Sequence, residues 1–411
     1  MPINLTPEFF AAADPQVSFD GGRILFSGQK SAGGRWQVWE MEADGSSARQ
    51  VSNCRTDCLR AAYLPDDEIV YTAVETRKGR REAHLEVCKR DGSEAHAVTF
   101  GPGDFQVETV LSSGMILASA SWPLTAGNEP GCPRQFYTLR PDGTALEAFR
   151  CEHQEAALRA EARELADGSV VFVKSALGDE RPGGRLAEMR RGATHNALIG
   201  PPVEVAWPSE AWEADKLMVS RWIPREHGEG GRFDLYILNL KTEAFGERIY
   251  GESGISSIQA VPVASHSAPR SFWSLVDREA ETGHFICLNS YRSADEGRGR
   301  FSALIAAVRV LALDSETGRE RVLGDAQVEK DGSFYVAVPA NLPVRFQLLD
   351  AGGGTIHEQR GWVWARPGEE RGCAGCHESK ALAPENRWPL ALKRFDTPTP
   401  LGVKDDATSK P

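Results

Sequence analysis

Long apolar runs are absent from this sequence. No stretch approaches about 18 consecutive apolar residues, so we expect no transmembrane helix. Walker-type phosphate loops, G-x-S-x-G elbows and H-E-x-x-H pairs are also absent, so the chemistries that depend on those motifs are not indicated. The longest basic run is Arg77–Arg81, which we interpret as a hairpin tip, and the net charge is −11. Because that average charge repels a polyanion, we expect no nucleic-acid binding.

The N-terminus, Met1–Leu5, lacks the charged-then-apolar pattern of a signal peptide. Glycine and proline are plentiful by contrast, with 40 and 24 residues, and the hydrophobic and charged fractions are 41% and 26%. These values are typical of a soluble globular protein with many short strands and turns.

A repeated turn organises the first part of the chain. Asp44-Gly45, Asp91-Gly92 and Asp142-Gly143 follow short alternating segments and lie roughly 50 residues apart. Asp-Gly between alternating apolar residues predicts a hairpin, because glycine accepts the positive φ of a tight turn. Several strands per unit at this period are typical of propeller blades.

The repeats predict an all-β fold, a β-propeller of about six blades over residues 1–299. The opening Ser18-Phe19-Asp20-Gly21 resembles the strand pair of TolB-type (PD40) propeller repeats. The faintest copies lie at 217–240 and at 272–276 with 285–288. A generic pair of β-sandwiches is the alternative. Residues 152–165 are rich in helix-forming residues, but the repeat register makes the end of this segment a strand, so we expect a short helix or loop at most.

The character of the sequence changes after residue 300. Val308–Asp314, Val328–Pro339 and Val344–Asp350 read as strands, and Gly352-Gly353-Gly354 ends the last. We expect an inserted small β-sandwich over residues 300–356, a haem-binding segment over 357–395 and a flexible tail over 396–411.

One motif carries recognisable chemistry. Cys373-Ala374-Gly375-Cys376-His377 matches C-x-x-C-H, in which two thiols add to the vinyl groups of one haem and the histidine becomes an axial iron ligand. The small residues between the cysteines let the loop approach the porphyrin. Composition alone would produce about 0.003 such matches in this chain. The motif therefore predicts one covalent haem c held by Cys373, Cys376 and His377.

Two other interpretations of the motif lack support. A redox dithiol of the thioredoxin type needs a βαβ context, which the sequence does not show. A zinc site needs a second pair of ligands, and no other C-x-x-C or H-x-x-x-H occurs.

The residues around the motif suit a haem pocket. Trp362, Trp364 and Trp388 could wall an apolar face, although a tryptophan is more often an ordinary core residue. One or two nearby cations could pair with the haem propionates, although such residues are usually solvated. These cations are Arg360, Arg366, Arg371, Lys380, Arg387, Lys393 and Arg394.

The distal haem ligand is unknown from the sequence. No methionine follows His377, and His357 is the nearest other histidine and a weak candidate. An iron without a protein ligand on its distal side would be open to small molecules.

Six further cysteines leave room for up to three disulfides in an oxidising compartment. Cys54 with Cys58 and Cys132 with Cys151 are the closest pairs in sequence. Scattered buried thiols are the alternative.

The runs Val338–Val344, Phe346–Ala351 and Arg366–Glu378 resemble the middle region of hydrazine synthase alpha subunits. The resemblance covers about 50 residues and implies a six-bladed propeller with an inserted domain, a c-type haem at its edge and an extracytoplasmic, redox-linked role, with periplasmic location expected. Two features depart from that family. The chain has only one C-x-x-C-H, and no tyrosine follows Tyr335, whereas the family uses a tyrosine just after the motif.

We therefore expect a His-ligated monohaem cytochrome for electron transfer, working with a redox partner protein, rather than hydrazine synthesis. A haem enzyme acting on a small nitrogen or oxygen species is one alternative. A propeller scaffold that binds partners is the other. The sequence leaves the oligomeric state, substrate and redox potential undecided.

Overall fold

The fold is known from a computed structural model. It describes residues 2–77, 80–121, 134–149, 157–177, 183–191, 193, 195–210, 213, 215–225, 230–292, 304–314, 319–359, 361–375 and 386–402. Within those ranges the chain forms strands and one 3₁₀ turn, η1 (Leu390–Lys393), but no α-helix, which confirms the all-β prediction. The described part accordingly contains no helix suited to crossing a membrane.

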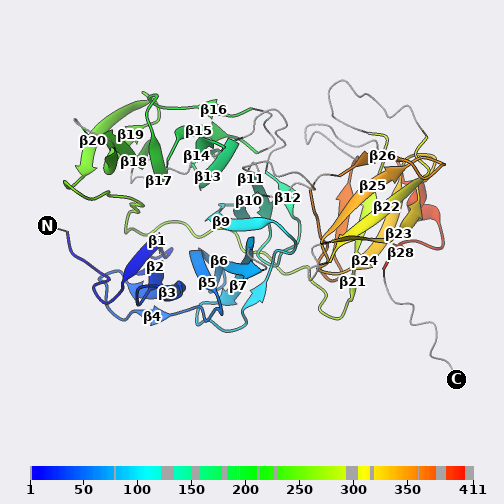
Figure 1. Ribbon diagram of the computed structural model, residues 1–411, viewed down its shortest axis with the longest axis horizontal. Coiled ribbons are helices and arrows are strands. Elements are labelled where there is room, and N and C mark those ends of the chain that lie inside the picture. Colours follow the sequence, from blue (N-terminus) through cyan, green and yellow to red (C-terminus); the bar gives the residue numbers. More distant parts are fainter. Residues whose placement is uncertain are drawn as a thin grey trace. The chain divides into compact units, whose positions relative to one another are not determined.

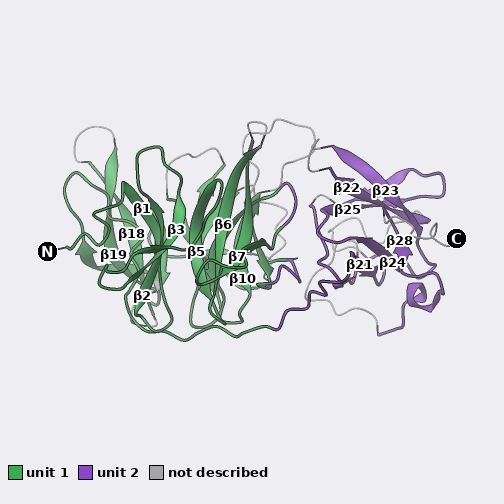
Figure 2. Cartoon of the chain, turned by 90° about the horizontal axis from the view of Figure 1, so that it is seen from below, with its two compact units in different colours: residues 1–99, 103–141, 147–272 green, residues 100–102, 142–146, 273–411 purple. Residues whose placement is uncertain are grey.

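The chain divides into two compact units, coloured separately in Figure 2. Unit 1 comprises residues 1–99, 103–141 and 147–272. Unit 2 comprises residues 273–411 together with two short segments, 100–102 and 142–146. The loops after β8 and β11 thus belong to unit 2, although the strands before them belong to unit 1.

Unit 1 is a propeller-like body of five four-stranded antiparallel arrays among the described residues. Each array uses four consecutive strands, and the second and third join through one parallel pair, Ala83↔Asp104. The strands are β1 Ala11–Val17, β2 Arg23–Gln29, β3 Gln37–Glu42, β4 Arg49–Gln50; β5 Asp57–Leu64, β6 Glu68–Arg77, β7 Arg80–Lys89, β8 His96–Ala97; β9 Asp104–Val110, β10 Ile116–Ser121, β11 Gln135–Leu139, β12 Glu147–Ala148; β13 Ala157–Glu164, β14 Val170–Ala176, β15 Arg185–Met189, β16 Ala197–Leu198; β17 Val205–Glu210, β18 Lys216–Pro224, β19 Gly231–Asn239 and β20 Ala244–Tyr250.

The predicted Asp-Gly hairpins are confirmed. Gly45, Gly92 and Gly143 have φ values of 88°, 88° and 82°. In each turn the aspartate Oδ1 accepts the backbone N–H two residues later, as in Ser46 N–H to Asp44 at 2.8 Å. Asx turns of this kind need only local contacts, which explains why the sequence alone located them.

Two segments differ from the repeat pattern expected of them. The sixth copy was predicted at 272–276 with 285–288, but residues 272–276 form no strand and Phe285 lies in unit 2. The sequence predicts a short helix or loop at most over residues 152–165 before a final strand, but Ala157–Glu164 is β13, because pairing along β14 overrides the helix propensity of these residues.

The first strand of every array carries a β-bulge. The bulges fall at Asp14, Arg60, Glu108, Glu161 and Trp207, where the pairing register with the second strand shifts. Figure 1 shows these first strands, β1, β5, β9, β13 and β17, facing the middle of unit 1, with the extended segment after β20 running past them. The bulges therefore aim five side chains at one central region.

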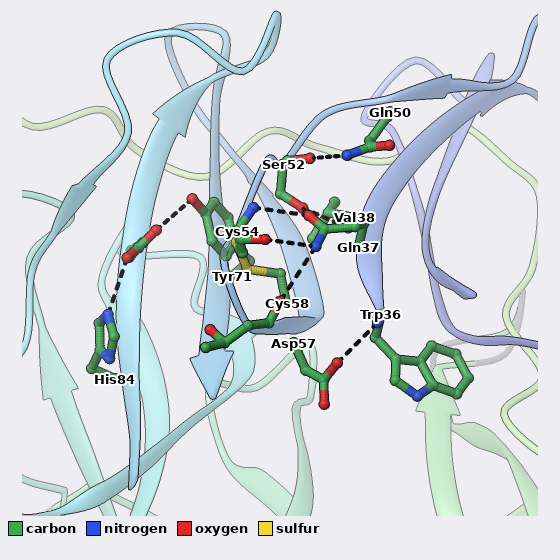
Figure 3. Close-up of a disulfide and its surroundings, with 12 residues drawn as sticks. Trp36, Gln37, Val38, Gln50, Ser52, Cys54, Asp57, Cys58, Tyr71 and His84 are labelled. Carbon is green, nitrogen blue, oxygen red and sulfur yellow. Dashed lines mark hydrogen bonds and ion pairs between the residues drawn. A yellow bond between two sulfur atoms is a disulfide. The ribbon is translucent and has the colours of Figure 1, made fainter. Parts of the chain in front are cut away.

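A disulfide joins Cys54 and Cys58 at the start of β5, with the two Cα atoms 6.3 Å apart. Figure 3 shows the Gln37 amide bracing the loop. Its Nε2 donates to Cys54 O at 3.1 Å, and its Oε1 accepts the Cys54 N–H at 3.0 Å. One of the two predicted pairs is thus confirmed, whereas Cys132 and Cys151 lie outside the described residues.

Unit 2 contains two four-stranded sheets. One has the order β27-β21-β24-β28, and the other has the order β23-β22-β25-β26. The strands are β21 Thr282–Cys287, β22 Ala307–Leu313, β23 Glu320–Gln327, β24 Phe334–Pro339, β25 Val344–Leu349, β26 Thr355–Glu358, β27 Glu370–Cys373 and β28 Thr399–Pro400. Both sheets contribute to one apolar core, including Phe285 and Val336 from the first and Val310 and Leu348 from the second. The pair is the small β-sandwich that the sequence predicted.

The sandwich recruits strands from outside residues 300–356. β21 precedes that range, and β27 and β28 follow it. The segment expected to be a flexible tail contains β28. Thr399–Pro400 pairs with β24, and Leu401 is buried in the core, so this part of the tail is ordered. Burial of one leucine and two backbone pairs hold this part of the tail in place.

Candidate haem attachment site

Cys373, the first residue of the predicted haem motif, is the last residue of β27. Cys376 and His377 lie outside the described residues, so their roles in haem attachment stay a prediction. β27 pairs in parallel with β21 at the edge of its sheet, from His284↔Glu370 to Cys287↔Cys373. The Leu288 N–H donates to Cys373 O at 2.8 Å and extends this pairing. A strand edge therefore sets the position at which the motif loop begins.

The Cys373 side chain lies on the core side of its sheet. Along β27, Glu370 and Gly372 are exposed, whereas Arg371 and Cys373 are half-buried. Neighbouring side chains in register share a face, so Cys373 lies beside the buried Cys287. Cys373 packs against the same apolar cluster that contains Phe285. A half-buried thiol next to apolar side chains suits the apolar edge of a porphyrin.

Gly375 lies too close to a neighbouring backbone segment for any larger residue. A Cβ on Gly375 would lie 2.7 Å from the backbone oxygen of Arg292, closer than any side chain tolerates. Beside Gly372, by contrast, nothing lies within 4 Å of such an added atom. Gly375 therefore lies close to the turn that follows β21, while open space remains beside Gly372 on the exposed face of β27.

The three tryptophans differ in environment. Trp364 is fully buried, at 0% exposed, and its Nε1 donates to Gly143 O at 3.2 Å. Its ring also meets Phe100 edge-on at 5.8 Å. Trp362 is 3% exposed under the Arg345 guanidinium, whereas Trp388 is 67% exposed. The two buried rings thus serve the core of unit 2, as tryptophans usually do.

Several of the predicted propionate partners already bind protein groups. Arg371 donates to Trp364 O and to Leu146 O, and lies over the Phe285 ring. Arg366 donates to Asn341 Oδ1 at 2.8 Å, and burial lowers the pKa of its guanidinium. Both cations are therefore occupied in the core.

The other cations near the motif differ in their surroundings. Arg394 pairs with Asp396 and Glu329 near the end of the described chain. Lys393 is exposed. Arg360 and Lys380 lie outside the described residues.

His357, the distal-ligand candidate, lies on the other sheet of the sandwich from Cys373. It is a half-buried residue of the edge strand β26, opposite Leu348. Its role as an iron ligand stays a prediction.

Sequence reasoning missed a polar cluster on the outer face of the strand that carries the motif. His284 Nδ1 pairs with Glu370, and the Tyr335 hydroxyl donates to both Glu370 oxygens at 2.9 and 3.0 Å. The His284 and Tyr335 rings meet edge-on at 5.8 Å. Burial, reinforced by the hydrogen bond to Glu370, raises the pKa of Tyr335 to about 12. No sequence signal joins these residues, because they come from three strands.

The described part of the motif fits covalent haem attachment. Cys373 lies at the end of β27 and packs against an apolar cluster, whereas the open space beside Gly372 is on the opposite face of the strand. Haem would supply redox chemistry there, and Cys373, Cys376 and His377 would hold it. The described residues show no group of three or more His, Cys, Asp or Glu side chains that could bind a metal ion on its own.

Comparisons with known proteins agree with the predicted resemblance. A family model described as the hydrazine synthase alpha subunit middle domain matches residues 288–378, a range that includes the C-x-x-C-H motif. Hydrazine synthase subunit alpha of Kuenenia stuttgartiensis is 21% identical to the chain over 91% of its length, and the match covers 60% of that protein.

The solved structure of Kuenenia stuttgartiensis hydrazine synthase matches 95% of this chain and 66% of its own, with a TM-score of 0.82 at 20% identity. TolB from Acinetobacter baumannii matches 57% of this chain and 53% of its own, with a TM-score of 0.41 at 13% identity. The chain thus resembles the hydrazine synthase alpha subunit in sequence and fold. It spans about 60% of the length of that curated relative.

Proposed function

We propose that this chain is a c-type cytochrome that carries one covalent haem on Cys373, Cys376 and His377 and transfers electrons to a partner protein outside the cytoplasm. The observation that carries the proposal is the C-x-x-C-H motif at the end of β27, inside the region that matches the hydrazine synthase alpha middle domain. The motif chemistry needs two thiols and a histidine at this spacing and nothing further from the chain.

Electron transfer is the simplest role for such a site. Arg366 and Arg371 are taken up by backbone and core contacts, so neither is offered to a substrate. Trp362 and Trp364 are likewise buried in packing. The described residues around the motif therefore support a role in holding a redox group rather than a set of catalytic side chains arranged around a substrate.

The extracytoplasmic part of the proposal is supported by the disulfide between Cys54 and Cys58, since disulfides persist in oxidising compartments. Covalent haem attachment also normally takes place outside the cytoplasm. Fractionation of cells that express the full natural gene should find the protein with periplasmic markers, and recovery with cytoplasmic markers would contradict this part.

The test of haem attachment is production of the full chain with a haem-maturation system, followed by intact mass and a pyridine haemochrome spectrum. We expect a mass increase of one haem and a c-type spectrum. The double variant Cys373→Ser/Cys376→Ser should lose both. Cys88→Ser is the matched control, because Cys88 is a buried thiol of β7 whose pKa burial raises to about 12. Wild-type protein without covalent haem would overturn the proposal.

A second candidate function is a haem enzyme that acts on a small nitrogen or oxygen species. The resemblance to hydrazine synthase and the lack of a methionine after His377 favour it. Spectra of the reduced protein with and without carbon monoxide separate the two roles. A spectrum that carbon monoxide leaves unchanged means a six-coordinate iron and favours electron transfer. A clear shift means an open or labile site and moves the enzyme ahead.

A further inference from the structure

A pocket lies at the centre of unit 1, whereas the predicted haem motif belongs to unit 2. It is lined by the bulge residues of all five first strands, Asp14, Arg60, Glu108, Glu161 and Trp207. Its volume is about 50 Å³, room for a molecule of a few heavy atoms. Four of these bulge residues, all but Glu108, have positive φ values between 47° and 59°. Non-glycine residues held at positive φ are strained, and such strain collects at functional sites.

The extended segment after β20 supplies a sixth wall. Gln259 also has a positive φ, 55°, and lines the same pocket. Its Oε1 accepts the Asp14 N–H at 3.0 Å, and its Nε2 donates to Asp14 Oδ1 at 2.9 Å. The segment after β20 therefore contributes Gln259 to the pocket, and this residue bonds back to the first strand of the unit.

Most polar groups of the pocket have protein partners. Asp14 Oδ2 accepts the Ser27 hydroxyl at 2.9 Å, in addition to its bond with Gln259. Arg163 Nη1 donates at 2.7 Å to the backbone oxygens of Glu108 and Ala162. Glu161 Oε2 accepts the Trp207 N–H at 2.6 Å. These bonds fix Asp14, Glu161 and Arg163 in the walls of the pocket.

Glu108 has a carboxylate oxygen that lacks such a bond among the described residues. Its side chain is fully buried, and its Oε2 accepts the Ala162 N–H at 3.0 Å. Its Oε1 is buried and has no hydrogen bond among the described residues. The nearest cationic group that pairs with it is Arg60 Nη1 at 3.6 Å, which is beyond hydrogen-bonding distance. A buried carboxylate oxygen without a donor costs free energy, and a ligand that donates would remove that cost.

The charges of the lining point the same way. Three carboxylates, Asp14, Glu108 and Glu161, face two guanidiniums, Arg60 and Arg163, so the ionised pocket has one negative charge in excess. Apolar side chains complete the walls, among them Ala62, Val107 and Val261. A ligand with a small cationic head that donates hydrogen bonds and a short carbon part matches both features.

We propose that this central pocket binds a small alkylammonium cation, with the ammonium head donating to Glu108 and Glu161 and the carbon part against the apolar wall. The site is independent of haem attachment. It assigns the propeller-like unit a binding role of its own.

The test is calorimetric titration and thermal unfolding of the full chain with methylammonium chloride at pH 8. Tetramethylammonium chloride and potassium chloride at equal ionic strength are the controls, because neither cation donates a hydrogen bond from nitrogen. We expect methylammonium alone to bind at one site per chain and to raise the unfolding temperature. Equal responses to all three salts, or none to methylammonium, would mean that the pocket holds only water.

Variants locate the site. Glu108→Gln should weaken methylammonium binding at least tenfold, because the amide keeps the shape and loses the charge. The matched control is Glu40→Gln, another buried glutamate of unit 1, which pairs with Arg49 away from the pocket and should leave the affinity unchanged. Binding that survives Glu108→Gln would overturn the proposal. The comparison of salts on the wild-type chain decides the matter if that variant does not fold.

Discussion

The two units of this chain are both built from groups of four strands, but the strands of each group are drawn from the sequence in different ways. In unit 1 every array uses strands that are consecutive in the sequence. In unit 2 both sheets interleave distant segments, and β21 lies between β24 and β27. The partners His284 and Glu370 are 86 residues apart. Because strand pairing in unit 1 is local, its strand order can be predicted from its turns. The strand order of unit 2 depends on contacts between segments that are distant in the sequence.

This difference determines how far the effect of a substitution should spread in each unit. The haem motif begins on a strand whose partners come from the other end of unit 2, so loss of a distant contact should disturb it. The bulges of unit 1 lie within hairpins, so a change in one array should leave the next largely intact. Four predictions, each with its own variants, test the contrast.

The largest effect is expected at Trp364, which joins the distant segments 100–102 and 142–146 to the core of unit 2. Trp364→Ala removes a fully buried ring and a hydrogen bond to Gly143 and should cost about 3–5 kcal/mol of unfolding free energy. Trp388→Ala, at a 67% exposed position, should change it by less than about 0.5 kcal/mol. Denaturant titration measures both, and hydrogen exchange should show the Trp364→Ala loss in unit 2. Equal effects would contradict the contrast.

A smaller and local effect is expected at the disulfide of unit 1. Cys54→Ser/Cys58→Ser opens a loop of only a few residues, so the chain-entropy model predicts a loss of about 2 kcal/mol. Unfolding of the wild type with and without reductant should show the same difference, and the double variant should not respond to reductant at these positions. A loss that spread to hydrogen exchange in unit 2 would contradict a local role.

The third effect depends on pH. Burial raises the pKa of Glu161 from 4.5 to about 7. Between these values the folded chain holds a proton that the unfolded chain has released, so the contribution of Glu161 to stability falls as pH rises from about 4.5 to 7. The slope is at most about 1.4 kcal/mol per pH unit.

Glu161→Gln should remove this slope, because the amide does not titrate. Unfolding free energies of wild type and variant between pH 5 and 7.5 measure the difference. Glu247→Gln, at an exposed position of β20, is the control and should keep the wild-type slope. Parallel pH profiles for Glu161→Gln and wild type would show that Glu161 does not titrate in this range.

The smallest effect compares two tyrosines that each donate to a glutamate. Tyr335 donates across strands to Glu370, 35 residues away, and Tyr250 donates to Glu252, two residues away. Tyr335→Phe should cost about 1 kcal/mol, since it removes a hydrogen bond that ties β24 to β27. Tyr250→Phe should cost less, because the bond is exposed and local. Urea titration of both variants is the measurement, and a larger loss at Tyr250 would reverse the expected order.

Much of unit 1 was predictable because its signals are short-range. The Asp-Gly turns needed only the positive φ that glycine accepts, and strand alternation between them followed directly. The sixth copy failed for the complementary reason. Residues 272–276 resemble a repeat in composition, yet whether a segment pairs depends on a free neighbouring edge, and β21 pairs with β24 and β27 instead.

The candidate site was predictable in its chemistry but not in its surroundings. The spacing of Cys373, Cys376 and His377 predicts haem attachment without reference to the fold. Cys287 beside Cys373, and His284 with Glu370 and Tyr335, could not be foreseen, since parallel pairing across more than 80 residues leaves no pattern in the sequence.

By itself, then, the sequence determined the all-β class and the hairpin turns and predicted covalent haem attachment, because each inference depends on residues a few positions apart. Tertiary structure alone decided which strand edge carries Cys373 and which five bulges, with Gln259, enclose the pocket of unit 1. Both are outcomes of strand register and sheet order. Those are settled by which distant surfaces bury the most apolar area, and local residue preferences do not encode them.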